Sequence, residues 1–130
     1  MDIRFDKREA VYIQVIRYFK EQIAIGELKS GQEIPSRREL AQRLKINPNT
    51  VQRAYKEMEE EGLIYTDGNK PSMITKETGR IKEIRESLID EAIDQFVDRI
   101  TSLQIPKEQV FDLVQSKLNE LGREDEEKHD

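Results

Sequence analysis

The sequence predicts a mainly α-helical chain with one small β-hairpin. Apolar residues recur at intervals of three and four along most of the 130 residues, which is the periodicity of amphipathic helices. Two short β-prone stretches, 63–66 and 72–75, flank a turn-like segment. Apolar residues make up 35% of the chain and charged residues 38%, which favours several helices around modest cores over one large core.

The first predicted helix spans residues 11–25 and ends at Gly26. Its apolar positions share one face, and charged residues occupy the other. Ser36 is expected to cap a second helix, with Glu39 three residues later completing a capping box. This second helix is short, because its pattern breaks at Lys45.

A third helix is expected to begin at the cap residue Asn47, with Pro48 at its first position, where the missing N–H has no cost. Gly62 ends it. The inward positions of this helix are Val51, Ala54, Tyr55 and Met58. Two short helices joined by a tight turn form a helix-turn-helix, and the hairpin that follows is a candidate wing. We therefore predict a winged helix-turn-helix over residues 1–75.

The turn of this motif has one unusual residue. Ala41 is small enough to let the two helices cross closely, and Ile46 is placed to fill the gap between them. The turn position that glycine usually fills is Lys45. A non-glycine residue with positive φ is uncommon, so we expect a slightly altered turn.

The C-terminal part, residues 76–121, is predicted to form two helices. A broad apolar stripe begins near Ile81, and Ile105-Pro106 interrupts the helical pattern before the last helix. Residues 122–130 contain no apolar side chain and are predicted to be a disordered acidic tail.

The stripe has two interpretations: a helix folded back on its own domain, or a dimer interface. We favour the dimer, because the small N-terminal domain can cover little of the stripe and burying each large apolar side chain contributes ~1.5–3 kcal/mol. A two-fold dimer also presents two reading heads to a palindromic site. The predicted dimerisation residues are Ile81, Ile84, Leu88, Ile89, Ala92, Ile93, Phe96, Val97, Ile100 and Leu103.

Charge is segregated along the chain, although the net charge is −5. Residues 1–75 hold 13 basic and 12 acidic residues, whereas residues 76–130 hold 9 and 15. Residues 34–56 hold six basic residues against one acid. A local basic patch matters more for contact with phosphates than the total charge.

The outward face of the third helix suits contact with nucleic acid. Its polar residues are Asn49, Thr50, Gln52, Arg53 and Lys56. Amide and guanidinium groups can make paired hydrogen bonds to base edges, and Lys or Thr can contact phosphates. The alternative is an ordinary solvated helix face, which the hairpin and the charge segregation make less favourable. The predicted partner is therefore double-stranded DNA.

Other classes of function have weak support in the sequence. The chain has no cysteine and one histidine, His129, so we expect no metal, no cofactor and no enzyme activity. The consecutive carboxylates of 59–61 suit a solvated helix end rather than a catalytic pair.

We expect a cytoplasmic protein without a signal peptide or membrane span. The two C-terminal helices leave little room for a small-molecule effector within one subunit; a cleft between subunits stays open. The alternative function is an adaptor that no longer reads DNA.

Five segments together resemble the GntR family of bacterial transcription regulators. They are Tyr12-Ile-Gln-Val, Ile25-Gly-Glu-Leu, Ser30-Gly-Gln-Glu-Ile-Pro-Ser-Arg-Arg-Glu-Leu-Ala, Asn47-Pro-Asn-Thr-Val-Gln-Arg-Ala-Tyr and Glu60-Glu-Gly-Leu-Ile-Tyr. Asn-Pro-Asn-Thr-Val followed by a short helical segment is similar to the YtrA subfamily. The resemblance implies a homodimeric DNA-binding repressor, and control of a neighbouring transporter operon is plausible for YtrA-like proteins.

The resemblance also implies roles for particular residues. The arginine of Pro-Ser-x-Arg-x-Leu, which contacts DNA in the family, is Arg38 here, and the segment from Asn47 enters the major groove first. The wing Asp67-Gly-Asn-Lys-Pro departs from the commoner Gly-x-Gly-x-[Ser/Thr]-[Phe/Tyr], so its depth in the minor groove is open. The predicted DNA-binding residues are Ser36, Arg37, Arg38, Asn47, Pro48, Asn49, Thr50, Gln52, Arg53, Lys56, Gly68, Asn69 and Lys70.

Overall fold

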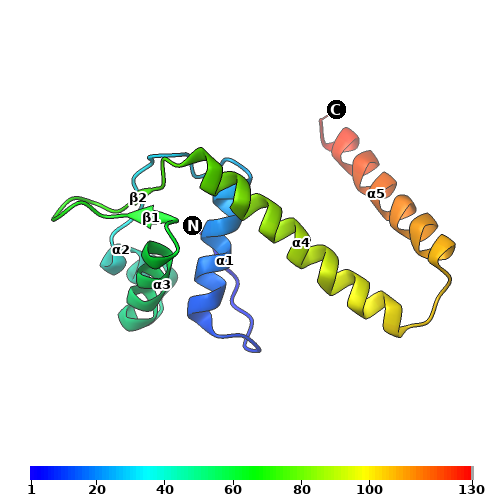
Figure 1. Ribbon diagram of the computed structural model, residues 1–130, viewed down its shortest axis with the longest axis horizontal. Coiled ribbons are helices and arrows are strands. Elements are labelled where there is room, and N and C mark those ends of the chain that lie inside the picture. The colour runs from blue at the N-terminus through cyan, green and yellow to red at the C-terminus, as the bar shows by residue number, and fades with distance from the viewer. Residues whose placement is uncertain (130) are drawn as a thin grey trace. The chain divides into compact units, whose positions relative to one another are not determined.

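The computed structural model describes residues 1–129, and the side chains of residues 1–127. The chain forms five helices and two strands within the described residues (Figure 1). In chain order they are α1 (Val11–Ala24), α2 (Arg37–Leu44), α3 (Pro48–Glu60), β1 (Ile64–Tyr65), β2 (Met73–Ile74), α4 (Thr78–Ser102) and α5 (Lys107–His129). The predicted fold class, mainly helical with one small hairpin, is confirmed. No helix in the described part of the chain is both long and apolar enough to span a membrane.

The chain forms two compact units, residues 1–89 and the residues from 90 onward. Their boundary lies inside α4, whereas the sequence suggested a division after residue 75. The first part of α4 belongs to the N-terminal unit because it packs there: Ile84 is only 4% exposed, and Ile81 and Leu88 pack partly against the same core. This corrects the prediction for Ile84, whose side chain is buried within the monomer and is not available to a partner.

The core of the N-terminal unit is built from the inner faces of α1, α2 and α3. All four residues predicted to face inward on α3 are fully buried. The remaining core residues are Val15, Ile16, Phe19, Ile23, Ile34, Leu40, Ala41, Leu63, Ile64, Ile74 and Ile84. Because one face of α3 is buried in this core, its opposite face is turned to solvent.

Ser36 and Asn47 cap α2 and α3 as predicted, but the bond described for the Glu39 carboxylate comes from the Ser36 hydroxyl and not from the Ser36 N–H of a capping box. The Ser36 hydroxyl accepts a hydrogen bond from the Glu39 N–H at 3.1 Å and donates to a Glu39 carboxylate oxygen at 3.3 Å. The Asn47 side chain accepts from the Asn49 N–H at 2.8 Å, and Pro48 opens α3. These caps satisfy N–H groups that have no partner inside a helix, and they fix where α2 and α3 begin.

The turn between α2 and α3 keeps the left-handed geometry that glycine usually supplies. Lys45 itself adopts it, with φ 56° and ψ 46°, and the Ile46 N–H donates to the Ala41 carbonyl at 3.1 Å. The turn is therefore not visibly altered by the missing glycine. Instead, Lys45 carries the steric cost of a left-handed side-chain residue, about 1 kcal/mol.

Residues 32–34 pair with the outer edge of the hairpin, which the sequence did not predict. β1 and β2 pair antiparallel, with Ile64 opposite Ile74. On the other side of β2, the Ile74 N–H donates to the Gln32 carbonyl at 2.8 Å, and the Ile34 N–H donates to the Ser72 carbonyl at 3.0 Å. The segment before α2 thus anchors the base of the hairpin, and its tip extends away from the helices of the same unit (Figure 1).

The C-terminal unit consists of the later part of α4 and of α5. The predicted break at Ile105-Pro106 is confirmed, since α4 ends at Ser102 and α5 begins at Lys107. α5 continues to His129, so residues 122–129 are helical where the sequence analysis expected a disordered tail; residue 130 lies outside the described residues. Their Arg, Glu and Lys residues have high helix propensity, which allows an existing helix to extend without apolar contacts.

Replacing Lys45 by glycine is expected to stabilise the protein, because glycine adopts positive φ without a clash of its Cβ. We expect Lys45→Gly to raise the free energy of unfolding by about 0.5–1 kcal/mol, measured by urea denaturation. Lys45→Ala is the matched control: it removes the charge but keeps the Cβ, so no gain is expected. A gain of the same size in Lys45→Ala would assign the effect to charge rather than to backbone strain.

Candidate nucleic-acid interface

The outward face of α3 offers several polar side chains to solvent. Asn49, Gln52 and Lys56 are exposed, and Thr50 is half-buried. In residues 1–127, no hydrogen bond or ion pair to another residue is described for the side chains of Gln52 and Lys56. An amide and an ammonium group without intramolecular partners can bind base edges and phosphates.

Arg53 lies on the same helix, and its guanidinium group is held by two neighbours. It lies over the aromatic ring of Tyr12 on α1, with Cζ 3.8 Å from the ring centroid. Its Nε is 3.6 Å from a carboxylate oxygen of Glu57. The side chain is still 61% exposed. The contact of Tyr12 with this face was not predicted from the sequence, where Tyr12 counts only as one of the apolar positions of the helix over residues 11–25.

The two arginines at the start of α2 differ in their surroundings. Arg37 donates from Nη2 to Glu59 at 2.9 Å, and its guanidinium lies over the ring of Tyr55 at 5.2 Å. Only about a third of its side chain is exposed. Arg38 is exposed, and no intramolecular partner is described for it within residues 1–127. Of this pair, Arg38 is the one whose charge is available to an external partner.

The wing tip is exposed. Gly68 has φ 59°, and the Lys70 N–H donates to the Asp67 carbonyl at 3.0 Å, which closes a turn. Positive φ at this position favours glycine. Asn69 and Lys70 are exposed at the tip.

The base of the wing is tied to α3 by a polar network. The Thr66 hydroxyl donates to Glu59 at 2.9 Å, to the same carboxylate oxygen that accepts from Arg37, and it also contacts the Ser72 hydroxyl. Glu59 therefore joins the start of α2, the end of α3 and the wing. This corrects the interpretation of residues 59–61 as a solvated helix end: Glu61 is also paired, with Lys20 at 3.2 Å.

The ionisable groups with shifted pKa values support the fold around the site. The Tyr55 hydroxyl donates to the Pro35 carbonyl at 2.6 Å, and burial raises its pKa. Glu9 accepts two hydrogen bonds from Arg17, at 2.6 and 2.9 Å, and this pairing lowers the pKa of the Glu9 carboxyl. Neither group is placed to exchange protons with a substrate.

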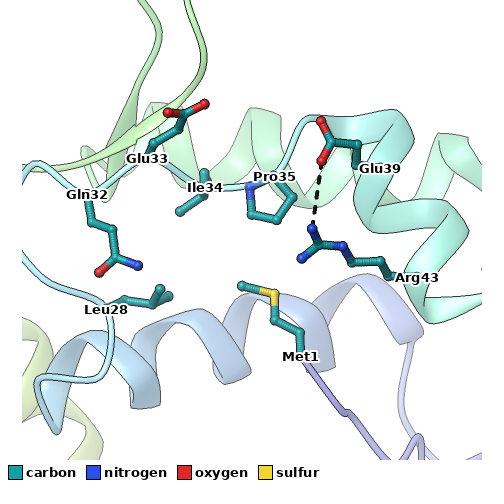
Figure 2. Close-up of a pocket in the computed structure, with 8 residues that line it drawn as sticks. All are labelled: Met1, Leu28, Gln32, Glu33, Ile34, Pro35, Glu39 and Arg43. Atoms are coloured by element: carbon teal, nitrogen blue, oxygen red, sulfur yellow. Dashed lines mark ion pairs between the residues drawn. The ribbon is translucent and has the colours of Figure 1, made fainter.

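A hollow of about 380 Å³ lies beside α2. Figure 2 shows the residues around it: Met1, Leu28, Gln32, Glu33, Ile34, Pro35, Glu39 and Arg43. The Arg43 guanidinium is paired with Glu39 at 3.8 Å along one side. Among the described residues, no group of three or more His, Cys, Asp or Glu side chains is arranged to hold a metal.

A second, apolar hollow of about 280 Å³ lies within the C-terminal unit. It is lined by Phe96, Ile100, Val110, Leu113, Val114, Lys117 and Leu118. Neither hollow combines enclosure with convergent polar groups, so the expectation of no dedicated effector site within one subunit stays a prediction.

A helix-turn-helix with an exposed polar face, followed by a wing, is the arrangement of a DNA-binding regulator. Comparison with known proteins agrees. Residues 11–74 match the family model described as bacterial regulatory proteins, gntR family.

Relatives match over most of the chain. The chain is 31% identical over 112 residues to the uncharacterized HTH-type transcriptional regulator YhcF of Bacillus subtilis, covering 86% of this chain and 93% of YhcF. It is 38% identical over 100 residues to the HTH-type transcriptional repressor YtrA of the same organism, covering 71% and 77%. A solved GntR family transcriptional regulator from Listeria monocytogenes superposes with a TM-score of 0.81 at 32% identity, covering 86% of this chain and 98% of that one. The chain belongs to the GntR family of DNA-binding transcriptional regulators.

Removing the carboxylate of Glu59 is expected to destabilise the N-terminal unit. Glu59→Ala leaves the half-buried Arg37 without its carboxylate partner and removes one of the two hydrogen-bond partners of the Thr66 hydroxyl. We therefore expect a loss of about 1–2 kcal/mol in the free energy of unfolding by urea denaturation. Glu60→Ala, at an exposed neighbouring position with the same helix propensity change, is the control and should change stability by no more than about 0.5 kcal/mol. Equal losses in both variants would refute the network's contribution.

Proposed function

We propose that this protein is a sequence-specific transcriptional repressor that binds a palindromic operator as a homodimer. The observation that carries the proposal is the outward face of α3, where Asn49, Gln52, Arg53 and Lys56 are exposed beside Arg38 on α2. A helix with such a face suits the major groove, whose base edges present distinct donor and acceptor patterns.

The residues divide by the contacts that their chemistry allows. Gln52 and Arg53 carry planar groups that can make paired hydrogen bonds to bases, with Asn49 near the start of the helix. Arg38, Lys56 and Lys70 carry exposed charges suited to phosphates, which position the protein without reading sequence. Ser36 and Arg37, which the sequence analysis included, are engaged in capping and in the Glu59 network, so we omit their side chains from the proposed DNA contacts.

The remaining predicted DNA contacts lie at the helix start and the wing tip. Asn47 caps α3, Pro48 is exposed beside it, and Thr50 is half-buried one turn later. Gly68 and Asn69 occupy the exposed wing tip, where close approach to a groove requires small or polar residues. We propose that the helix start lies nearest to the major groove and the wing tip reaches the adjacent backbone.

The homodimer is proposed from the apolar surface of the C-terminal unit. On α4, Phe96 is 42% exposed and Ile93 is 53% exposed, with Val97 between these values. Leu103, the residue after α4, is 68% exposed, and Ile89, the last residue of the N-terminal unit, is also exposed. α5 adds large exposed apolar residues that the predicted stripe did not include: Phe111, Leu113, Leu118 and Leu121. Monomeric proteins rarely expose so many large apolar residues on two successive helices, so a second copy is the proposed cover.

Repression is proposed by similarity. YtrA of Bacillus subtilis, 38% identical over 100 residues, is named a transcriptional repressor. Control of a transporter operon is proposed only from the resemblance of the Asn47-Pro-Asn-Thr-Val segment to the YtrA subfamily.

Removing the two arginines of the proposed reading face tests DNA recognition. Arg38→Ala with Arg53→Ala is expected to lower affinity for DNA from upstream of the protein's own gene by about 100-fold or more in electrophoretic mobility shift. Each subunit of the proposed dimer loses a paired base contact of Arg53, worth about 1–3 kcal/mol, and a phosphate contact of Arg38. Arg85→Ala with Arg123→Ala removes the same charge from exposed positions outside the reading face and should leave binding within a fewfold. Unchanged binding by the first variant, or equal loss by both, would show that the reading face is wrongly assigned.

Placing a charge in the exposed apolar surface tests the dimer. Phe96→Asp is expected to convert a dimer to a monomer in sedimentation equilibrium, because an unpaired carboxylate is costly to bury in an interface. Gln95→Asp adds the same charge at the neighbouring polar position and should leave the dimer in place. A monomeric wild-type protein, or a Phe96→Asp variant that remains dimeric, would contradict the proposed interface.

A further inference from the structure

We propose that Tyr12 is a specificity-determining residue that acts through Arg53, holding its guanidinium group in the orientation that recognises a guanine in the major groove. The inference rests on the proposed function and deepens it, because it assigns the chemistry of one base contact and a positioning residue outside the helix-turn-helix. Tyr12 is a positioning residue here: it contacts Arg53 and not the base.

The stack between Tyr12 and Arg53 is the closest of its kind in residues 1–127. The Arg53 Cζ atom is 3.8 Å from the ring centroid, whereas the other cation–aromatic pairs lie between 5.2 and 5.9 Å. At 3.8 Å the guanidinium is in van der Waals contact with the ring. The two residues come from α1 and α3, whose packing against each other forms part of the core.

The stack leaves the hydrogen-bonding edge of Arg53 available. Aromatic stacking uses the face of the guanidinium plane, whereas its N–H donors point outward in that plane. Glu57 occupies the side of Nε, at 3.6 Å. The two Nη nitrogens form the opposite fork, and within residues 1–127 no hydrogen bond from them is described. The guanidinium of Arg53 is therefore held by Tyr12 on one face and by Glu57 at Nε. Its two Nη nitrogens remain in position to donate to a pair of acceptors.

Guanine is the base that offers such an acceptor pair. Its O6 and N7 atoms both accept hydrogen bonds on the major-groove edge, and a bidentate arginine is their commonest specific partner. A free arginine side chain loses much rotamer entropy when it makes this contact. The ring of Tyr12 and the carboxylate of Glu57 restrict Arg53 before DNA arrives, so less entropy is lost on binding.

The proposed contact uses the ring of Tyr12 and not its hydroxyl group, so a variant that lacks only the hydroxyl is a matched control. Tyr12→Phe keeps the aromatic face and should keep the recognition of guanine. Tyr12→Leu fills similar space next to the core without an aromatic face and should lose it. Because Tyr12 is half-buried, Tyr12→Met serves as a second variant without a ring, and urea denaturation of each variant checks that it folds.

The experiment uses the full chain and a duplex enriched from a random-sequence pool by the wild-type protein. Protection of guanine N7 from dimethyl sulfate identifies the guanine that Arg53 contacts, since Arg53→Lys should expose it. We expect Tyr12→Leu and Tyr12→Met to lose the same protection and about tenfold in affinity for this duplex, while Tyr12→Phe keeps both. Affinity for random-sequence duplex should stay unchanged in all variants, because phosphate contacts are untouched.

A double-mutant cycle separates positioning from an independent effect. If Tyr12 acts through Arg53, Tyr12→Leu combined with Arg53→Lys should bind no more weakly than Arg53→Lys alone. Multiplying losses would overturn the inference, as would unchanged guanine protection in the folded Tyr12→Leu variant or tighter binding by it. A wild-type protein that enriches no sequence would instead overturn the proposed function, so the two failures are distinct.

Discussion

The burial of Tyr55 is the interaction on which the N-terminal unit depends. Its ring packs edge-to-face against Phe19 of α1, with centroids 6.0 Å apart, and its hydroxyl donates to the Pro35 carbonyl just before α2. The ring also lies beneath the guanidinium of Arg37. One side chain of α3 therefore fixes the positions of α1 and of the start of α2. With that face of α3 held inward, the 3.6-residue period of the helix directs Gln52, Arg53 and Lys56 outward.

A polar interaction extends this control to the wing. Glu59 lies one turn after Tyr55 on α3, and one of its carboxylate oxygens accepts from both Arg37 and Thr66. Half-buried charged groups contribute little net stability, but they restrict geometry because each donor must meet its acceptor. Arg37 thus contributes to both interactions, above the ring of Tyr55 and beside Glu59. Arg37 was predicted from the sequence to contact DNA. Its contacts in the structure instead connect the start of α2 with α3 and, through Glu59, with the base of the wing.

The sequence predicted those features that depend on local chemistry. Helix periodicity identified the buried face of α3, and the caps at Ser36 and Asn47 followed from side chains two or three residues from the N–H groups they satisfy. The roles of Tyr12 and Glu59 could not be predicted in this way, because their partners lie 41 residues away for Tyr12 and 22 residues away for Glu59. The apolar stripe of α4 shows a second limit. Periodicity reports that a face is apolar but not which surface covers it, so Ile84, buried in the N-terminal unit, and Phe96, exposed in the other, had the same signature.

Charge and directional contacts have different parts in the proposed recognition of DNA. Phosphate attraction supplies most non-specific affinity for DNA, and it scales with the number of cations brought to the backbone. Here the net charge is −5, and several basic residues of the N-terminal unit are already paired: Arg17 with Glu9, Lys20 with Glu61 and Arg37 with Glu59. Arg38, Lys45, Lys56 and Lys70 are exposed around the outward face of α3 and the wing, and such charges suit phosphate contacts that position the protein without reading sequence. In the proposed function, discrimination between sequences depends on side chains whose orientation is set before binding. Arg53, held between Tyr12 and Glu57, is the residue of the reading face for which the structure provides such an orientation.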